Sequence, residues 1–151
     1  MRAIVQRVSH ASVSLPDGEK RSVGKGFLVL LGVGVNDTEA DAVWLAAKTA
    51  KLRVFENEAG KFDKALSDIA GEVLVISQFT LYGVCGKGAR PDFTGAARPE
   101  KAVPLYGKYV SELKKLGFSV KTGEFGAEMK VELLNDGPVT IIIERENGIT
   151  K

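Results

Sequence analysis

Three largely apolar runs place the strongest limit on how this chain can fold. They cover residues 27–35, 73–76 and 139–143, and turn-forming residues bound each of them. Short apolar runs bounded in this way are typical of strands that a sheet buries on both faces. We therefore expect a sheet whose central strands are fully covered. Alternating or shorter segments predict further strands at residues 2–14, 21–23, 118–120 and 130–134.

Two further segments have the periodicity of amphipathic helices. The first begins after Thr38, which forms a capping-box pattern with Asp41. The second ends at Gly117, and its regular part is expected to begin near Pro104 rather than at Pro99, because proline disrupts a helix interior. The positions expected to form the apolar faces are Val43, Ala46, Ala47, Ala50 and Val54 in the first helix and Leu105, Tyr109, Leu113 and Leu116 in the second.

The order of these segments predicts an α+β fold. Strands and helices do not alternate strictly, so a purely parallel sheet is not expected. Residues 135–138, with the sequence NDGP, are a strong turn signal and predict a hairpin between strands at 130–134 and 139–143. A chain of 151 residues is expected to form one compact domain over residues 1–151. We predict mixed and antiparallel sheets in a barrel-like arrangement with two main helices.

Composition narrows the function only a little. The net charge of +2 is too small to indicate nucleic-acid binding, although residues 86–115 carry seven basic against three acidic side chains. The single cysteine, Cys85, excludes an internal disulfide and is usual in a reducing compartment. No segment has the length of a membrane span, and the first residues lack a signal-peptide pattern. We expect a cytoplasmic protein with no membrane partner.

The apolar run at 73–76 changes abruptly to a polar stretch. A strand end that turns polar at once can present groups to a ligand, although small polar side chains also form ordinary turns. The residues alone leave both interpretations open. The stretch consists of Ser77, Gln78, Phe79, Thr80 and Leu81.

The chain contains few residues that could move a proton or hold a metal. His10 is the only histidine, and Cys85 has no activating neighbour other than Lys87. No cysteine and histidine cluster has metal-ligand spacing, and no phosphate-binding loop is present. We therefore expect no metal and no cofactor. An enzyme of this composition would depend on backbone N–H donors, such as those of Phe79 and Thr80, which can stabilise a developing oxyanion.

Gly137 and Pro138 form a second unusual feature. For a generic Xaa-Pro bond the cis form is rare, at about 5–6% in folded proteins. The pair nevertheless offers two carbonyl acceptors and no side chain on the glycine. Such a pair could bind an ammonium group closely.

Several stretches together resemble the D-aminoacyl-tRNA deacylase family. The two most specific are residues 77–81, with the sequence SQFTL, and residues 135–140, with NDGPVT. Similar stretches follow the family's order over nearly the whole chain, at residues 1–8, 30–33, 52–55, 90–97 and 122–129. There are two departures: residues 84–90 are less polar and less basic than the family's usual segment, and Pro104 interrupts a helix that is normally free of proline.

The resemblance implies a homodimer that hydrolyses the ester between a D-amino acid and the 3′ end of tRNA. Residues 77–80 would form the catalytic pocket for the terminal adenosine and the aminoacyl ester. Gly137 and Pro138 of the partner chain, joined by a cis bond, would enter this pocket and hold the substrate's amino group with their carbonyls. An L side chain would collide with this pair, a D side chain would point away, and glycine would be accepted.

The resemblance also implies supporting roles. Leu81 and Met129 would belong to the pocket, Arg7 would support the Gly-Pro segment, and Lys87 and Arg90 would bind the tRNA.

Five accounts of the function remain open. We favour hydrolysis assisted by the substrate's own 2′-hydroxyl over attack by the Thr80 side chain, because no base is evident near Thr80. A different hydrolase could use Ser77 as nucleophile and His10 as base. A dimeric RNA-binding or scaffold module would catalyse nothing. A related deacylase could act on a mischarged L-amino acid.

Overall fold

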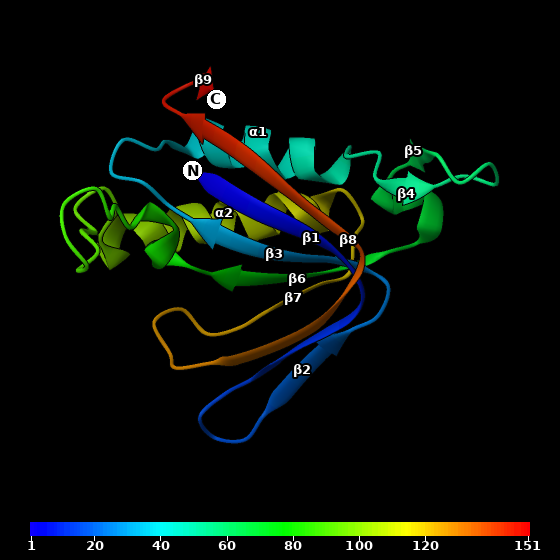
Figure 1. Cartoon of the computed structure of the whole chain (residues 1–151), viewed down its shortest axis with the longest axis horizontal. Coiled ribbons are helices and arrows are strands. Elements are labelled where there is room, and N and C mark those ends of the chain that lie inside the picture. Colours follow the sequence, from blue (N-terminus) through cyan, green and yellow to red (C-terminus); the bar gives the residue numbers. More distant parts are fainter.

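A seven-stranded mixed sheet forms the centre of the molecule in the computed structural model, which describes residues 1–151 (Figure 1). Its strands are β1 (Arg2–Ser14), β2 (Lys20–Val23), β3 (Gly26–Gly32), β6 (Glu72–Ser77), β7 (Val120–Thr122), β8 (Lys130–Glu146) and β9 (Ile149–Thr150). The remaining elements are α1 (Glu39–Ala50), α2 (Pro99–Lys115), the 3-10 helices η1 (Leu66–Ile69) and η2 (Phe79–Tyr82), and a separate hairpin of β4 (Phe55–Glu56) and β5 (Phe62–Lys64).

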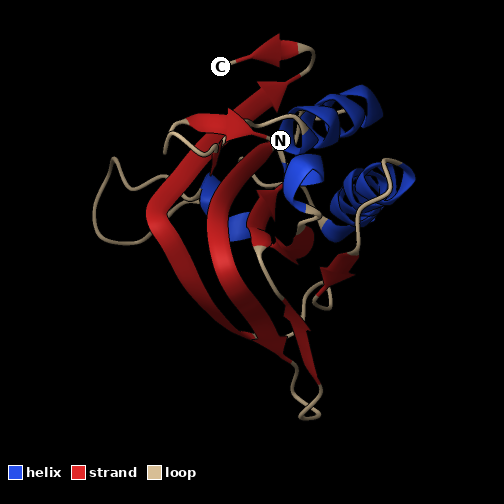
Figure 2. Cartoon of the chain, turned by 90° about the vertical axis from the view of Figure 1, so that its right-hand side faces the viewer, coloured by secondary structure: helices blue, strands red, loops and turns tan.

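The sheet combines parallel and antiparallel pairing in the order β7-β6-β3-β1-β8-β9, with β2 beside β1. β6 runs parallel to both β3 and β7, whereas β1 is antiparallel to β2, β3 and β8. The long strands β1 and β8 bend together, so the sheet forms a half-barrel (Figure 2). The predicted α+β class, with mixed sheet and two main helices, is confirmed.

Both helices cover the same face of the sheet, and the larger core lies between them and the strands (Figure 2). This core contains 24 buried residues, among them Val29 and Val75 from the sheet and Leu45 and Tyr109 from the helices. A second cluster of eight buried residues lies on the other face, where the bent parts of β1 and β2 enclose it. The apolar runs of β3 and β6 are therefore buried from both sides, as expected.

The capping box of α1 is confirmed, and its predicted apolar face is right at Ala46 and Ala50 but wrong at Val43. The backbone N–H of Thr38 donates to the Asp41 carboxylate at 2.8 Å. Val43 is 38% exposed, and the helix ends at Ala50, before Val54. The buried face includes a polar residue, Thr49, so the helical period of the buried positions could not be recognised from apolar residues alone. Thr49 can be buried because its hydroxyl donates to the Leu45 carbonyl at 2.8 Å. The buried positions are Asp41, Ala42, Leu45, Ala46, Thr49 and Ala50.

The expected start of the second helix near Pro104 is also wrong. α2 begins at Pro99, where the missing N–H costs nothing, and continues through Pro104. Pro104 and Glu100 are both exposed, so water can bind the Glu100 carbonyl that has lost its helical partner. Leu116 follows the helix and is 54% exposed rather than buried.

The turn predicted at residues 135–138 does not reverse the chain. Both flanking segments pair antiparallel with β1, so β8 is one strand that runs from Lys130 to Glu146. Gln6 pairs with Thr140 and Val8 with Asn135, so residues 136–139 stand opposite Arg7 alone. The Gly-Pro signal therefore marks a bulge within a strand instead of a hairpin. We call residues 136–139 the β8 bulge.

Two general properties bear on the function. Neither α1 nor α2 combines the length and the apolar character that a membrane-spanning helix requires. No group of three or more histidine, cysteine, aspartate or glutamate side chains is placed to hold a metal ion.

Candidate functional site

The predicted polar strand end lies at the end of β6, between β3 and the edge strand β7 in the strand order. Ser77 is the last residue of β6 and pairs with Leu31 of β3. The Gln78 N–H continues the ladder by donating to the Leu31 carbonyl at 2.8 Å, and η2 then begins at Phe79. The first bond of η2 runs from the Leu81 N–H to the Gln78 carbonyl. The N–H groups of Phe79 and Thr80 precede it and have no partner within this helix.

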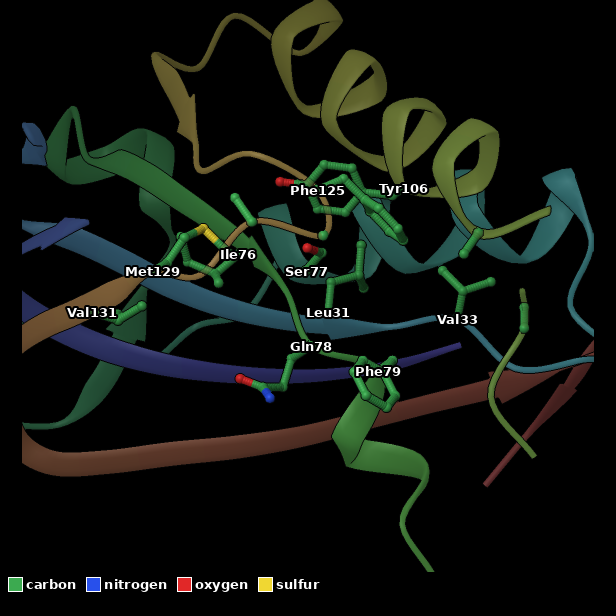
Figure 3. Close-up of a pocket in the computed structure, with 14 residues that line it drawn as sticks. Leu31, Val33, Ile76, Ser77, Gln78, Phe79, Tyr106, Phe125, Met129 and Val131 are labelled. Carbon is green, nitrogen blue, oxygen red and sulfur yellow. The ribbon is translucent and has the colours of Figure 1, made fainter. Parts of the chain in front are cut away.

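An apolar cavity of about 280 Å³ opens beside this strand end (Figure 3). β3, β6, α2 and the segment before β8 supply its walls, and eleven of its fourteen lining residues are hydrophobic. Four residues named in the sequence prediction line it: Ser77, Gln78, Phe79 and Met129. The other lining residues are Leu31, Val33, Ile76, Ala97, Ala102, Tyr106, Phe125, Gly126, Ala127 and Val131.

Aromatic rings give the cavity its shape. Tyr106 and Phe125 meet edge to face, with ring centroids 6.1 Å apart, and lie together on one side (Figure 3). Burial raises the pKa of Tyr106, and its protonated hydroxyl donates to the Val75 carbonyl at 2.8 Å. Phe79 is 56% exposed at the other side of the cavity, where it contacts Phe93. Flat apolar walls with few polar groups suit an aromatic ring such as a nucleobase.

Sequence reasoning missed the α2 side of this cavity. Tyr106 and Ala102 did not enter the predicted apolar stripe, although they lie four residues apart on the buried face of α2. The signal available in the sequence was Tyr106, which directly follows the stripe residue Leu105. A buried tyrosine needs a hydrogen-bond partner for its hydroxyl, so its position next to the stripe was informative.

Thr80 and Leu81 do not line the cavity. The Thr80 hydroxyl is exposed and accepts a hydrogen bond from the Gln78 side-chain amide. No histidine or carboxylate is among the lining residues, so neither Ser77 nor Thr80 has a neighbouring base there. His10 is exposed on β1, opposite Leu134, and is not a lining residue.

The backbone of η2 is fixed by Arg2 and by the packing of its own last residue, Tyr82. Arg2 donates to the Leu81 carbonyl, its guanidinium carbon lies 5.1 Å from the centre of the Tyr82 ring, and its Nε pairs with Glu144 at 2.8 Å. The Tyr82 ring packs so closely on Gly34 that a Cβ there would lie 2.9 Å from it. η2 is therefore held in one position against the sheet.

The β8 bulge carries Gly137 and Pro138, and both residues are exposed and lie outside the cavity of this chain. The peptide bond between them is cis, and Gly137 has φ 151°. A Cβ on Gly137 would lie 2.7 Å from the Val139 nitrogen, so only glycine fits there. Asn135 closes the base of the bulge by accepting from the Val139 N–H at 2.7 Å.

Arg7 supports the bulge from behind. Its side chain is almost fully buried, and it donates to the Asp136 carbonyl and to the Val54 carbonyl, each at 2.7 Å. The guanidinium carbon also lies 5.5 Å from the centre of the Phe62 ring. A buried, fully engaged arginine keeps the shape of the bulge constant.

Lys87 and Arg90 lie in an exposed loop next to the site. Two backbone hydrogen bonds of 2.9 Å between Val84 and Asp92 close this loop. The following residue, Phe93, packs edge-on against Phe79, with ring centroids 5.2 Å apart. The loop therefore begins and ends beside the cavity.

Comparison with known proteins identifies a matching family and similar proteins of nearly the same length. Residues 4–144 match the family described as D-Tyr-tRNA(Tyr) deacylase. A Roseiflexus sp. (strain RS-1) protein named D-aminoacyl-tRNA deacylase is 55% identical over 144 residues, which cover 95% of this chain and 93% of that protein. A Heliobacterium modesticaldum protein of the same name is 51% identical over 148 residues, which cover 98% and 99%.

Two solved structures have a similar fold. One, named c-Myc DNA Unwinding Element Binding Protein, is 42% identical with a TM-score of 0.89, over 96% of this chain and 99% of that one. The other, described as a probable eukaryotic D-amino acid tRNA deacylase, has a TM-score of 0.82 over 93% and 97%. At 14% identity, the second likeness concerns the fold alone.

Proposed function

The chain belongs to the D-Tyr-tRNA(Tyr) deacylase family, and we propose that it hydrolyses the ester that joins a D-amino acid to the 3′ end of tRNA. Free D-amino acid and tRNA are the products. The observation that carries the proposal is the cavity beside residues 77–79, which is apolar, has aromatic walls and contains no titrating base. Such a cavity suits the terminal adenosine of tRNA, with the ester at the strand end.

The backbone of η2 can activate the ester carbonyl. The N–H groups of Phe79 and Thr80 have no partner within η2 and are fixed in place through Arg2 and Tyr82. Preorganised donors of this kind stabilise the negative charge that develops on the carbonyl oxygen. In this proposal, the cavity orients the adenosine so that the carbonyl oxygen reaches both donors.

The substrate supplies the group that the protein lacks. The ribose 2′-hydroxyl lies next to the 3′-ester and can hydrogen-bond the attacking water. The water oxygen bonds to the carbonyl carbon, the bond from this carbon to O3′ breaks, and a proton passes to O3′. No side chain of the cavity has to accept that proton, which agrees with a lining free of histidine and carboxylates.

Chiral selection requires a second copy of the chain. We propose that Gly137 and Pro138 of one subunit enter the cavity of the other and bind the α-amino group through their carbonyls. Three observations support this: the pair is exposed, it lies outside its own cavity, and the buried Arg7 donates to the adjacent Asp136 carbonyl. An exposed apolar side chain on the sheet face away from the helices, Ile142, is 64% exposed and is available for such an association.

The consequence for specificity follows from steric exclusion. An L side chain would be directed into the Gly-Pro backbone, whereas a D side chain would be directed away from it. Glycine has nothing to exclude, so glycyl-tRNA is also hydrolysed. The L ester is disfavoured because its side chain would clash with the Gly-Pro backbone, and a rigid bulge cannot move to relieve this clash.

One assay tests the proposal. Purified protein is incubated with D-Tyr-tRNA, L-Tyr-tRNA and Gly-tRNA, and release of the amino acid is followed. We expect rapid hydrolysis of the D and glycyl esters and at least about a hundredfold slower hydrolysis of the L ester. Equal rates on the D and L esters contradict the selection mechanism, and no turnover on any ester favours a binding module.

Two variants in the same assay separate the possible nucleophiles. His10→Ala should leave the rate on D-Tyr-tRNA unchanged, because His10 is exposed and does not line the cavity. Thr80→Ala should retain measurable activity, because the hydroxyl has no neighbouring base and only accepts a bond from Gln78. Complete loss of activity in a folded Thr80→Ala protein would assign the attack to that hydroxyl instead.

A further inference from the structure

We infer that Arg98 and Lys101, here called the rim pair, bind the phosphate backbone of the tRNA's 3′-terminal strand where it leaves the cavity. The inference rests on the proposed function and adds a contact surface to it. Neither residue belongs to the predicted site, whose tRNA contacts were Lys87 and Arg90. The rim pair lies on a different element, the beginning of α2.

The rim pair is placed directly beside the cavity. Arg98 follows Ala97 and Lys101 precedes Ala102, and both alanines line the cavity. Backbone bonds hold this segment to the end of β3: the Ala97 N–H donates to the Val33 carbonyl at 2.9 Å, and the Val35 N–H donates to the Gly95 carbonyl at 3.1 Å. The backbone that carries the two cations therefore has a fixed position next to the cavity's lining.

The charge of the rim pair is available to a ligand. Arg98 is exposed at the N-cap of α2 and pairs with no carboxylate, unlike Arg2, Arg21 and Arg53. The Lys101 ammonium donates one bond to the Val35 carbonyl and retains two further donors. A guanidinium fork beside an ammonium group suits phosphate oxygens.

Nearby acids do not cancel this charge. Glu100 is two residues from Arg98, which places it about 200° around the helix, whereas Lys101 is three residues away and on the same side. The ion pairs of α2 involve Lys108 and Lys115, and neither Glu100 nor Asp92 forms an ion pair with Arg98 or Lys101.

A neighbouring hollow extends the polar surface. Lys101 lines a shallow polar depression of about 450 Å³ together with Asn36, Asn147 and Lys151. Its one carboxylate, Glu146, pairs with Lys151.

Geometry connects this surface to the substrate. When the terminal adenosine occupies the cavity, the phosphate on its 5′ side and the preceding nucleotides must pass over the rim. Backbone phosphates contribute most of the salt-dependent affinity in nucleic-acid binding. The rim pair therefore affects the binding of the tRNA strand and leaves the chemistry at the ester unchanged.

The test compares two substrates that share the ester but differ in phosphates. One is D-Tyr-tRNA, and the other is 3′-O-D-tyrosyl adenosine, which has no phosphate. The variant is R98Q/K101Q, and the matched control is Lys114→Gln, an exposed lysine about 20 Å further along α2. Thermal unfolding confirms that all three proteins fold, which is expected because the changed side chains are exposed.

We expect R98Q/K101Q to raise the KM for D-Tyr-tRNA about tenfold at physiological salt, with kcat nearly unchanged. The slope of log KM against log salt concentration should fall by about one for each cation removed. The kcat/KM for the adenosine ester should stay within about twofold of wild type, and Lys114→Gln should match wild type on both substrates.

Two results overturn the inference: an equal loss of activity on both substrates, or an unchanged KM and salt slope for D-Tyr-tRNA. A wild-type protein that cleaves neither substrate contradicts the proposed function itself, so the two failures are distinguishable.

Discussion

Two arginines of β1 each contact the backbone of one half of the proposed site. Arg7 donates to the Asp136 carbonyl at the base of the β8 bulge, and Arg2 donates to the Leu81 carbonyl in η2. Neither contact can be inferred from one-dimensional patterns, because each joins residues far apart in sequence. Arg7 was expected to support the bulge only through family resemblance, and Arg2 was not singled out at all.

Arg2 offers a prediction about positioning. Arg2→Gln removes the ion pair with Glu144 and the contact with the Tyr82 ring, so the η2 backbone loses its support. We expect kcat on D-Tyr-tRNA to fall about tenfold with little change in KM, because the donors of Phe79 and Thr80 move while the cavity remains. Arg2→Lys, which keeps the positive charge, should have a kcat between those of the wild type and Arg2→Gln.

The matched control for Arg2 is Arg53→Gln. Arg53 also forms an ion pair, with Asp63, but it is exposed and contacts no part of the cavity. Steady-state kinetics of the three variants provide the comparison. A rise in KM at constant kcat for Arg2→Gln would show that Arg2 contributes to binding instead of positioning.

At the level of elements, sequence patterns predicted the strands and helices better than the connections between them. The apolar runs of β3 and β6 and the capping box of Thr38 were correct because local residues decide them. Pro104 was misjudged because an exposed carbonyl tolerates the loss of its partner. The NDGP segment was misjudged because β1 pairs with both sides of it, and only tertiary structure determines that pairing.

The candidate site was likewise predicted only where local sequence decides the structure. Residues 77–81 were singled out because a polar stretch follows a buried strand, their role in a site was inferred from the family resemblance, and three of the five line the cavity. The α2 wall depends on how a helix docks against the sheet, which spacing alone does not give. The sequence therefore indicated one side of the cavity and left the opposite side undetected.

One element contact predicts a pH effect on stability. The buried Asp41 carboxylate accepts from the Thr38 N–H and, at 2.9 Å, from the Gly148 N–H beyond β8, so it joins α1 to the β8–β9 turn. Desolvation raises the pKa of Asp41, but the backbone hydrogen bonds from Gly148, Thr38 and Asn147 outweigh it, and the net pKa is lowered. Stability from Asp41 is therefore present above its unfolded pKa and is lost as the pH falls through the lower folded value.

Asp41→Asn should lower the free energy of unfolding by roughly 2 kcal/mol at pH 7, because the charged acceptor is lost. The difference from wild type should shrink as the pH falls below about 4. Urea unfolding at a series of pH values measures both effects. A difference that stays constant with pH would contradict a stabilising charge on Asp41, and Asp17→Asn, at an exposed turn, serves as the control.

At the scale of the whole molecule, the two halves of the proposed site do not meet within one chain. The cavity lies beside the end of β6, whereas the β8 bulge is exposed and outside it. In the proposed function, a single copy would hold the adenosine but would lack both the carbonyls that bind the α-amino group and the backbone that excludes an L side chain. The selectivity for D-amino acids would then be a property of the dimer, in which each subunit supplies the selecting bulge to the other.

Mixing two differently damaged chains tests this central claim directly. Gly137→Val distorts the bulge, because a Cβ at that position meets the Val139 nitrogen at 2.7 Å. Ala127→Trp fills the cavity, which Ala127 lines from a half-buried position. Each variant alone should be inactive on D-Tyr-tRNA while remaining folded by thermal unfolding.

After the two variants are unfolded and refolded together in equal amounts, half of the dimers are mixed, and each mixed dimer has one site with an intact cavity and an intact bulge. The account predicts recovery of about a quarter of the wild-type rate on D-Tyr-tRNA, with L-Tyr-tRNA still rejected. A mixture that stays as inactive as its components would contradict a site shared between subunits.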